Sequence, residues 1–322
     1  MSDRDPAVSI LISAYNAERF IEETIQSILA QTLSDFECVI VNDGSTDRTA
    51  EIIQRYTGDP RIIFIDLPKV GLCVALNQGL ERTRAPLIAR MDSDDVMLPN
   101  RLERQVEFMN AHPELGGCAS LYYLIDEHGG RIGVGSSPLT SVENIERHLA
   151  NGGHLIYPNP TTMIRRGVLK GLGGYRQEYA SCEDVDLFMR MYEAGQIVLV
   201  MPEYLLLWRI HGASLSSTSA ERQFHLIKVI FRNYHARRRG KPIITIEEHL
   251  ARVRTARGVR KLLSQAEVTS FALHRKAARA KTDAHKVRGN ALMLMAMALN
   301  PADAFWKVVR RTRAKLSAPS PS

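Results

Sequence analysis

Val8-Ser9-Ile10-Leu11-Ile12-Ser13-Ala14 is the stretch from which the fold of this chain can be deduced. It is short and apolar and ends at the polar residues Tyr15-Asn16, as a buried strand does. Three similar runs follow before residue 92, and the segments between them have helical spacing. The predicted strands are Val8–Ala14, Phe36–Val41, Arg61–Leu67 and Leu87–Met91, and the predicted helices are Ala17–Ala30, Asp47–Thr57 and Gly71–Thr83. Strands that are apolar on both faces and alternate with helices predict an α/β fold, with a mostly parallel sheet covered by helices.

After Met91 the alternation becomes less regular. The predicted elements are a polar loop Asp92–Pro99, a helix Arg101–Ala111, a strand Gly117–Ile125, a mobile loop Gly133–Pro138, a helix Glu183–Ala194, and strands Ile197–Val200 and Tyr204–Ile210. From residue 220 onward the pattern predicts helices only, near Glu221–Arg239, Glu247–Gln265, Thr269–Ala298 and Ala302–Lys315.

Composition indicates an ordinary globular protein, with 45% hydrophobic and 24% charged residues among 322. The most apolar candidate segment, Ala291–Leu299, is far shorter than the roughly 18–20 residues of a membrane span. The charged start Met1–Pro6 is not that of a signal peptide. Four cysteines without metal-site or redox spacing are expected to be reduced. We therefore expect a cytoplasmic protein.

The net charge of +7 conceals two oppositely charged parts. Residues 1–219 contain 19 basic and 29 acidic side chains, whereas residues 220–322 contain 23 basic and 6 acidic ones. We predict an α/β domain at 1–219 and a basic helical C-terminal region at 220–322. Such asymmetry points to an anionic partner.

Polar residues cluster where three predicted strands end. They are Ser13 to Asn16, Asn42 to Ser45, and Asp92-Ser93-Asp94-Asp95. In an open parallel sheet these ends converge and form the ligand site. Three carboxylates in four residues repel one another unless a cation lies among them, and Mg²⁺ or Mn²⁺ takes such oxygen ligands. A solvated acidic turn is the alternative for this motif taken alone.

Two common nucleotide motifs are absent from the sequence. No G-x-G-x-x-G follows the first strand and no Walker loop occurs, so a glycine cradle for phosphates is excluded. The acidic turn also lacks the EF-hand pattern.

Two later segments carry further candidates. Glu183 and Asp184 begin a helix, where the macrodipole favours negative charge, and such a carboxylate can accept a proton from a hydroxyl. An ordinary acidic first turn is the alternative. His211 ends the last predicted strand, and by itself it is compatible with a purely structural role.

Taken in order, these segments resemble the family 2 glycosyltransferases, which have the GT-A fold and use nucleotide-activated sugars. The resemblance extends from about Val8 to Ser216. It rests on V-S-I-L-I-S-A-Y-N-A, Q-T-L-S-D-F-E-C-V-I-V-N-D-G-S-T-D, G-L-C-V-A-L-N-Q-G-L, A-R-M-D-S-D-D, G-G-Y, E-D-V-D-L and W-R-I-H-G-A-S-L-S. Each motif is weak alone, but their order and spacing are specific.

The resemblance implies a role for each matching residue. Ser13, Tyr15 and Asp43 would hold the nucleoside, and Asp92 and Asp94 would bind the ribose side and a Mn²⁺ or Mg²⁺ ion on the diphosphate. Asp184 would be the catalytic base with Glu183 beside it in the acceptor site, and His211 would lie near the metal. Such a site transfers one sugar by single displacement with inversion.

The chain departs from the family pattern at one motif. The resemblance places Asn77 among the donor-binding residues, but Leu76 stands before it where the family often has arginine, so contact with phosphate or sugar would pass to Lys69 or Arg90. The expected donor is a UDP-sugar. The expected acceptor is a saccharide or lipid-linked hydroxyl in cell-surface polysaccharide, lipopolysaccharide or glycolipid assembly. Without the Q-x-x-R-W signature, one sugar is expected per encounter.

The basic C-terminal region leaves alternatives open. Its arginine clusters, with Phe305 and Trp306 beside the last of them, suit an amphipathic helix on the anionic inner face of a membrane, and they equally suit a solvated helical bundle. Rival functions are a sugar nucleotidyltransferase, a nucleic-acid-binding protein and an inactive binding homologue. The first lacks a glycine-rich first loop, the second lacks any recognition motif, and the intact acidic set disfavours the third.

Overall fold

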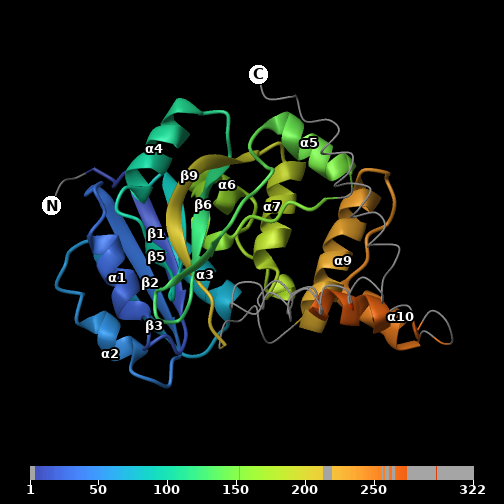
Figure 1. Ribbon diagram of the computed structural model, residues 1–322, viewed down its shortest axis with the longest axis horizontal. Coiled ribbons are helices and arrows are strands. Elements are labelled where there is room, and N and C mark those ends of the chain that lie inside the picture. Colours follow the sequence, from blue (N-terminus) through green and yellow to red (C-terminus); the bar gives the residue numbers. More distant parts are fainter. Residues whose placement is uncertain are drawn as a thin grey trace. The chain divides into compact units, whose positions relative to one another are not determined.

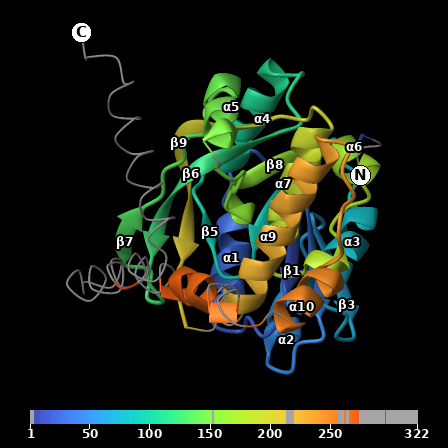
Figure 2. The ribbon, with the colours of Figure 1, turned by 90° about the vertical axis from the view of Figure 1, so that its right-hand side faces the viewer.

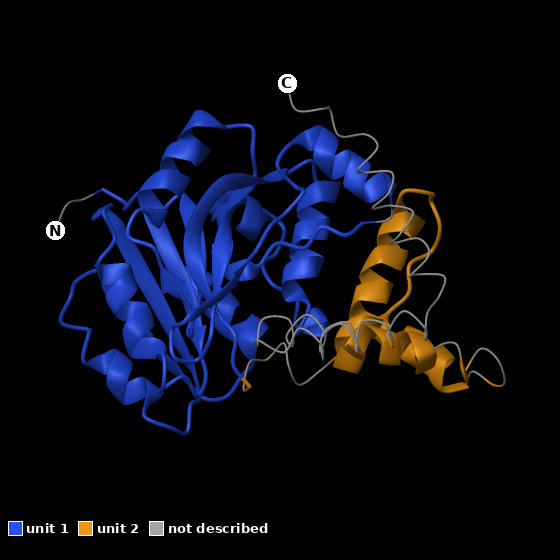
Figure 3. Cartoon of the chain, viewed as in Figure 1, with its two compact units in different colours: residues 1–211 blue, residues 212–322 orange. Residues whose placement is uncertain are grey.

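The computed structural model describes residues 4–151, 153–212, 220–255, 257, 261–262, 265–273 and 295. The chain divides into two compact units, 1–211 and 212–322 (Figure 3). The division predicted from the sequence falls after Ser219, and residues 213–219 lie outside the described residues.

In the described part of unit 1, nine strands form one sheet (Figure 1). The order is β3-β2-β1-β4-β8-β6-β9-β5, with β7 paired to β6. The strands are β1 (Val8–Ala14), β2 (Phe36–Asp43), β3 (Ile62–Leu67), β4 (Leu87–Asp92), β5 (Val96–Met97), β6 (Gly117–Ile125), β7 (Arg131–Val134), β8 (Thr162–Arg165) and β9 (Val198–Arg209). The long pairings β1–β2, β1–β4, β2–β3 and β6–β9 are parallel, and the short ones are antiparallel. The predicted α/β sheet is confirmed.

Helices cover both faces of this sheet. They are α1 (Ile21–Leu29), α2 (Thr49–Gln54), α3 (Leu72–Arg82), α4 (Arg101–Ala111), α5 (Val142–Ala150), α6 (Arg166–Gly171) and α7 (Glu183–Glu193), with 3₁₀ turns η1 (Asn159–Thr161) and η2 (Gln177–Tyr179). Ile10 and Ile12 share one buried core with α1, α2 and α4. Leu11 points the other way because side chains alternate along a strand, and it faces α3 at Gly79.

Several predicted boundaries were wrong. Ile197–Val200 and Tyr204–Ile210 belong to one strand, β9, whose pairing with β6 is irregular around Pro202, a residue that has no N–H to donate. The predicted loop Asp92–Pro99 contains β5, which pairs with β9. The predicted mobile loop Gly133–Pro138 begins inside β7, beside β6 (Figure 2). The strand β8 and the helices α5 and α6 were not predicted.

The described part of unit 2 contains the helices α9 (Ala220–Arg237) and α10 (Ile246–Thr255), in the region predicted to be helical. Asn233 of α9 fastens the segment between them, since its side chain both donates to and accepts from the backbone of Ile244, at 2.7 and 3.0 Å. The predicted helices Thr269–Ala298 and Ala302–Lys315 lie almost entirely outside the described residues. Within the described residues, no helix has the length and apolarity needed to cross a membrane.

The packing of α3 on the sheet gives a stability prediction. A Cβ at Gly79 would lie 2.5 Å from Cδ1 of Leu11 and 2.8 Å from Cγ2 of Val41, and both side chains are fully buried. Gly79→Ala should therefore destabilise the protein by about 1–3 kcal/mol, although alanine favours helix, because an overpacked core must shift. Thermal denaturation measures this.

The matched control is Gly167→Ala in α6. There a Cβ would have no neighbour within 4 Å, so helix propensity acts alone and the melting temperature should hold or rise. Equal effects of the two substitutions would contradict the packing argument.

Candidate functional site

The strand ends converge as the parallel topology predicts. Ser13 of β1 is aligned with Asp92 of β4, and Ala14 is aligned with Asn42 of β2. Asp43 is the next residue after Asn42, so the polar turns that follow β1, β2 and β4 lie at one edge of the sheet. This edge is where an α/β sheet binds its ligand.

On one side of the site, the ammonium group of Lys69 stacks on the ring of Tyr15. Nζ of Lys69 lies 3.0 Å from the ring centroid of Tyr15, and that ring is 45% exposed. The same Nζ forms an ion pair of 3.0 Å with Oδ2 of Asp43. Asp43 itself is buried, and its Oδ1 accepts hydrogen bonds from the backbone N–H groups of Val70 and Gly71, at 2.7 and 3.0 Å. In this structure Asp43 therefore fastens the β3–α3 loop and positions Lys69 over Tyr15.

Gly44 makes that arrangement possible. Its φ of 65° lies in the left-handed region, and a Cβ there would be 2.4 Å from the backbone nitrogen of Lys69. Any other residue would push the turn after β2 away from the loop that carries Lys69.

Asn77 lies in α3 but serves the backbone of Tyr175. Its Oδ1 accepts from the Tyr175 N–H at 2.9 Å and its Nδ2 donates to the Tyr175 carbonyl at 2.7 Å. This pair of bonds ties the G-G-Y segment to α3. The carboxamide predicted to contact the donor thus holds the segment that precedes α7.

The acidic turn after β4 gathers three carboxylates. Ligand oxygens of Asp92, Asp94 and Asp95 lie within 4.8 Å of one another. Asp92 and Asp94 are partly exposed, whereas Asp95 is fully buried and one of its oxygens has no hydrogen-bond partner among the described residues. Burial raises the pKa of Asp92 and of Asp95, and the neighbouring carboxylates add to this. An all-oxygen set of this kind fits a hard divalent cation.

Arg90 lies behind the turn. Its side chain is buried, donates from Nη2 to Oδ1 of Asp92 at 2.7 Å, and also contacts the Met91 carbonyl. A phosphate that contacts Arg90, as predicted, would therefore compete with Asp92 for the guanidinium.

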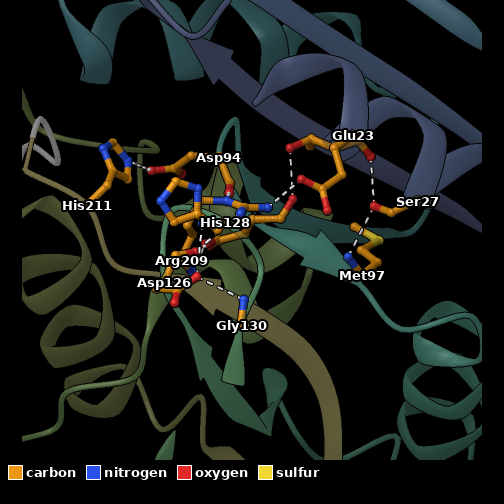
Figure 4. Close-up of polar contacts among 11 residues, drawn as sticks. Glu23, Ser27, Asp94, Met97, Asp126, His128, Gly130, Arg209 and His211 are labelled. Atoms are coloured by element: carbon orange, nitrogen blue, oxygen red, sulfur yellow. Dashed lines mark hydrogen bonds and ion pairs between the residues drawn. The ribbon is translucent and has the colours of Figure 1, made fainter. Parts of the chain in front are cut away.

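His211 closes the turn from the end of β9. Its Nε2 lies 2.7 Å from Oδ2 of Asp94 (Figure 4). The centroid of its ring lies 4.9 Å from that of the Phe20 ring. The structure thus brings together Asp94 and His211, which are more than a hundred residues apart in the sequence.

The start of α7 supplies two more carboxylates. Glu183 is buried and accepts a hydrogen bond from the Ser181 N–H at 3.0 Å, while Asp184 accepts one from the Val185 N–H at 2.7 Å. Burial raises the pKa of Glu183 to about 7 and that of Asp184 to about 6. The charge of Asp184 adds to the shift of Glu183, and the charge of Asp92 adds to that of Asp184. A carboxylate with a pKa of about 6 is ionised at neutral pH and basic enough to take a proton.

Two residues of this site were quoted in sequence motifs without a role. Tyr175 is buried, and the charges acting on its hydroxyl include those of Arg90, Glu183 and Asp184. Arg209 is also buried, and it contacts the acidic turn directly (Figure 4). Their places within G-G-Y and W-R-I-H marked them as motif members, but only the fold shows what they touch.

Comparison with known proteins agrees with this geometry. The model of the family described as Glycosyl transferase family 2 matches residues 9–173. The putative glycosyltransferase EpsE of Bacillus subtilis is 34% identical over 195 residues, which are 59% of this chain and 68% of that protein. The amylovoran biosynthesis glycosyltransferase AmsE of Erwinia amylovora is 32% identical over 206 residues, 62% and 74% of the two chains.

Solved structures show the same fold. The TarS 1-349 fragment from S. aureus, in complex with UDP-GlcNAc, superposes with a TM-score of 0.60 at 17% identity over 89% of each chain. The mannosyltransferase PcManGT from Pyrobaculum calidifontis, in complex with GDP-Man and Mn²⁺, superposes with a TM-score of 0.53 at 17% identity, over 95% of this chain and 84% of that one. The chain described here therefore belongs to glycosyl transferase family 2, and its fold is GT-A.

The raised pKa of Asp184 gives a prediction for stability. The folded pKa of about 6 lies above the ordinary 3.8, so ionisation of this carboxyl opposes folding. The stability contributed by its neutral form is present below pH 3.8 and is lost as the pH rises through about 6. Asp184→Asn cannot ionise, so its melting temperature relative to wild type should be higher at pH 7.5 than at pH 4.

Glu178→Gln, at an exposed carboxylate of η2, is the control and should show no such pH-dependent gain. A difference in melting temperature between Asp184→Asn and wild type that stays constant across this pH range would contradict the assigned burial effect.

Proposed function

We propose that this glycosyltransferase moves one sugar from a nucleotide-diphosphate sugar to an acceptor hydroxyl, with inversion at the sugar carbon. The observation that carries the proposal is the acidic turn Asp92–Asp95, which lies at the sheet edge beside the Tyr15–Lys69 pair. The charge of Asp92 in this turn helps to raise the pKa of Asp184. The residues proposed for the nucleotide, for the metal and for the base thus occupy one region.

The donor end of the site is built for a nucleoside diphosphate. The exposed Tyr15 ring offers a stacking surface, Ser13 lies beside Asp92 at the strand ends, and Lys69 provides a positive charge. Asp92 and Asp94, with His211 beside Asp94, would hold a divalent ion on the diphosphate. When bound, that ion would neutralise the negative charge that grows on the leaving oxygen.

The chemical step that we propose needs one proton acceptor. The acceptor hydroxyl oxygen attacks the sugar C1 from the face opposite the diphosphate. The new C–O bond forms as the bond between C1 and the phosphate oxygen breaks, and the hydroxyl proton passes to Asp184. The nucleoside diphosphate leaves with the bonding electrons. Glu183, with a pKa near 7, lies next to Asp184 and would hydrogen-bond the acceptor. No covalent intermediate is required.

A UDP-sugar is the proposed donor, and the proposed acceptor belongs to cell-surface polysaccharide, lipopolysaccharide or glycolipid assembly. The UDP-GlcNAc bound to TarS and the amylovoran role in the name of AmsE support these two choices. The Mn²⁺ bound with GDP-Man to PcManGT supports a divalent ion and makes a GDP-sugar the competing donor.

Calorimetric titration of UDP, GDP and ATP tests the donor site. UDP should bind in the presence of Mn²⁺, and EDTA or Asp94→Ala should weaken binding at least tenfold, because the diphosphate charge is then uncompensated. Asp184→Asn should retain this metal-dependent binding while sugar transfer is abolished. Preference for GDP would change the donor, and failure to bind any nucleoside diphosphate would refute the function.

We also propose that unit 2 places the enzyme on an anionic membrane surface. Its described part carries exposed basic side chains on and after both helices: Arg222, Lys228, Arg232, Arg237, Arg238, Arg239, Lys241, Arg252, Arg254, Arg257 and Lys261. The exposed acidic residues along the same stretch are Glu221, Glu247 and Glu248. Each basic residue near an anionic surface contributes about 1 kcal/mol to binding.

Vesicle sedimentation checks this role. Full-length protein should bind vesicles containing anionic lipid and be released by salt, and replacing Arg252, Arg254 and Arg257 with glutamine should weaken binding by roughly 100-fold. Arg55→Gln, at an exposed arginine of unit 1, should leave binding unchanged. Equal binding of all variants would remove the membrane proposal without affecting the donor site.

A further inference from the structure

Arg209 is a buried cation at the end of β9, two residues before His211. Its side chain is 2% exposed. The guanidinium donates from Nε to the Asp94 carbonyl at 2.8 Å, from Nη1 to the Asp126 carbonyl at 3.3 Å and from Nη2 to Oε2 of Glu23 at 2.5 Å. These three acceptors come from the acidic turn, the β6–β7 turn and α1.

The backbone of Arg209 reaches the same turn. Its N–H donates to Oδ1 of the buried Asp95 at 2.8 Å. Thr24 of α1 adds a bond from its hydroxyl to the Asp95 carbonyl, also at 2.8 Å. The side chain of Arg209 (Figure 4) thus holds the backbone of Asp94, and its backbone N–H holds the carboxylate of Asp95.

We propose that Arg209 is the positioning residue of the candidate metal site. It fixes the backbone of Asp94 and, through the strand end that it anchors, the place of His211. Of the three proposed ligands, Asp94 and His211 come from segments more than a hundred residues apart in sequence, and their distance of 2.7 Å depends on the relative position of β9 and the turn. This inference rests on the proposed function, since it concerns the metal that the function requires.

The geometry assigns this role to arginine specifically. A guanidinium has its donors in a rigid planar fork, and here they satisfy acceptors on three separate elements at once. Cζ of Arg209 also lies 4.8 Å from the centroid of the Phe20 ring, and the ring of His211 lies 4.9 Å from that same centroid. Lysine would keep the charge but could not serve all three acceptors.

Direct contact with the donor is the competing role for Arg209. The burial of the side chain and the occupation of Nε, Nη1 and Nη2 by protein acceptors disfavour it. A positioning role and a purely stabilising role make different predictions, because only the first changes the affinity for metal in a protein that remains folded.

The test compares Arg209→Lys with Arg104→Lys. Arg104 also uses all three nitrogens, with Nε and Nη2 on Glu203 at 2.9 and 3.0 Å and Nη1 on Glu107 at 2.6 Å, but it meets β9 within the strand, at Glu203, rather than at the acidic turn. Free Mn²⁺ is measured by electron paramagnetic resonance in the presence of saturating UDP. Arg209→Lys should raise the Mn²⁺ dissociation constant by about 10-fold or more, as loss of an outer-shell partner does, while Arg104→Lys matches wild type.

Two further readouts complete the experiment. Excess Mn²⁺ should restore bound Mn²⁺ and transfer in Arg209→Lys, which a misfolded site would not allow. If Arg209→Lys does not fold, Glu23→Gln removes only the ion pair at Nη2, from a half-exposed carboxylate, and should raise the Mn²⁺ dissociation constant by a few-fold.

Unchanged Mn²⁺ affinity in folded Arg209→Lys, or in Glu23→Gln if the lysine variant is unfolded, would overturn the inference and leave the proposed function standing. UDP binding by the wild-type protein without any Mn²⁺ uptake would instead overturn the metal part of the proposed function and this inference with it.

Discussion

The repulsion among the carboxylates after β4 is the constraint on which the rest of the site depends. Asp92, Asp94 and Asp95 are held within 4.8 Å at the end of a buried strand. Such a cluster destabilises the fold unless positive charge is placed around it. Three buried arginines do this: Arg90 donates to the Asp92 carboxylate, Arg209 donates to the Asp94 carbonyl, and Arg101 donates to the Arg90 carbonyl beneath the strand.

Arg101 is the most unusual of these three buried arginines. It is fully buried, its donors reach carbonyls, a carboxamide and a methionine sulfur rather than a carboxylate, and burial lowers its pKa to about 10. The charges of Asp95 and Asp92 partly oppose that shift. The negative charge of the acidic turn is thus balanced from behind by buried arginines.

The features that could be predicted from the sequence are those that depend on local patterns along the chain. The convergence of Ser13, Asp43 and Asp92 follows from parallel topology alone, and the periodicity of four strands was enough to establish that. The strand β8 and the helix α6 were missed because Thr162–Gly171 is too short for periodicity to show. The partners of Asn77, Asp43 and Arg209 were missed because those bonds join residues far apart in sequence.

The register of β9 joins these observations. Side chains alternate along a strand, so Arg209 and His211 share one direction, and both reach Asp94. A slip of one residue against β6 would turn both away together, because the side-chain period is two. The irregular pairing around Pro202 lies between the two regular stretches of the β6–β9 ladder. It therefore determines the register that places Arg209 opposite Ile125. The contact between Asp94 and His211 therefore depends on strand pairing that begins at the other end of β9, where no residue of the site lies.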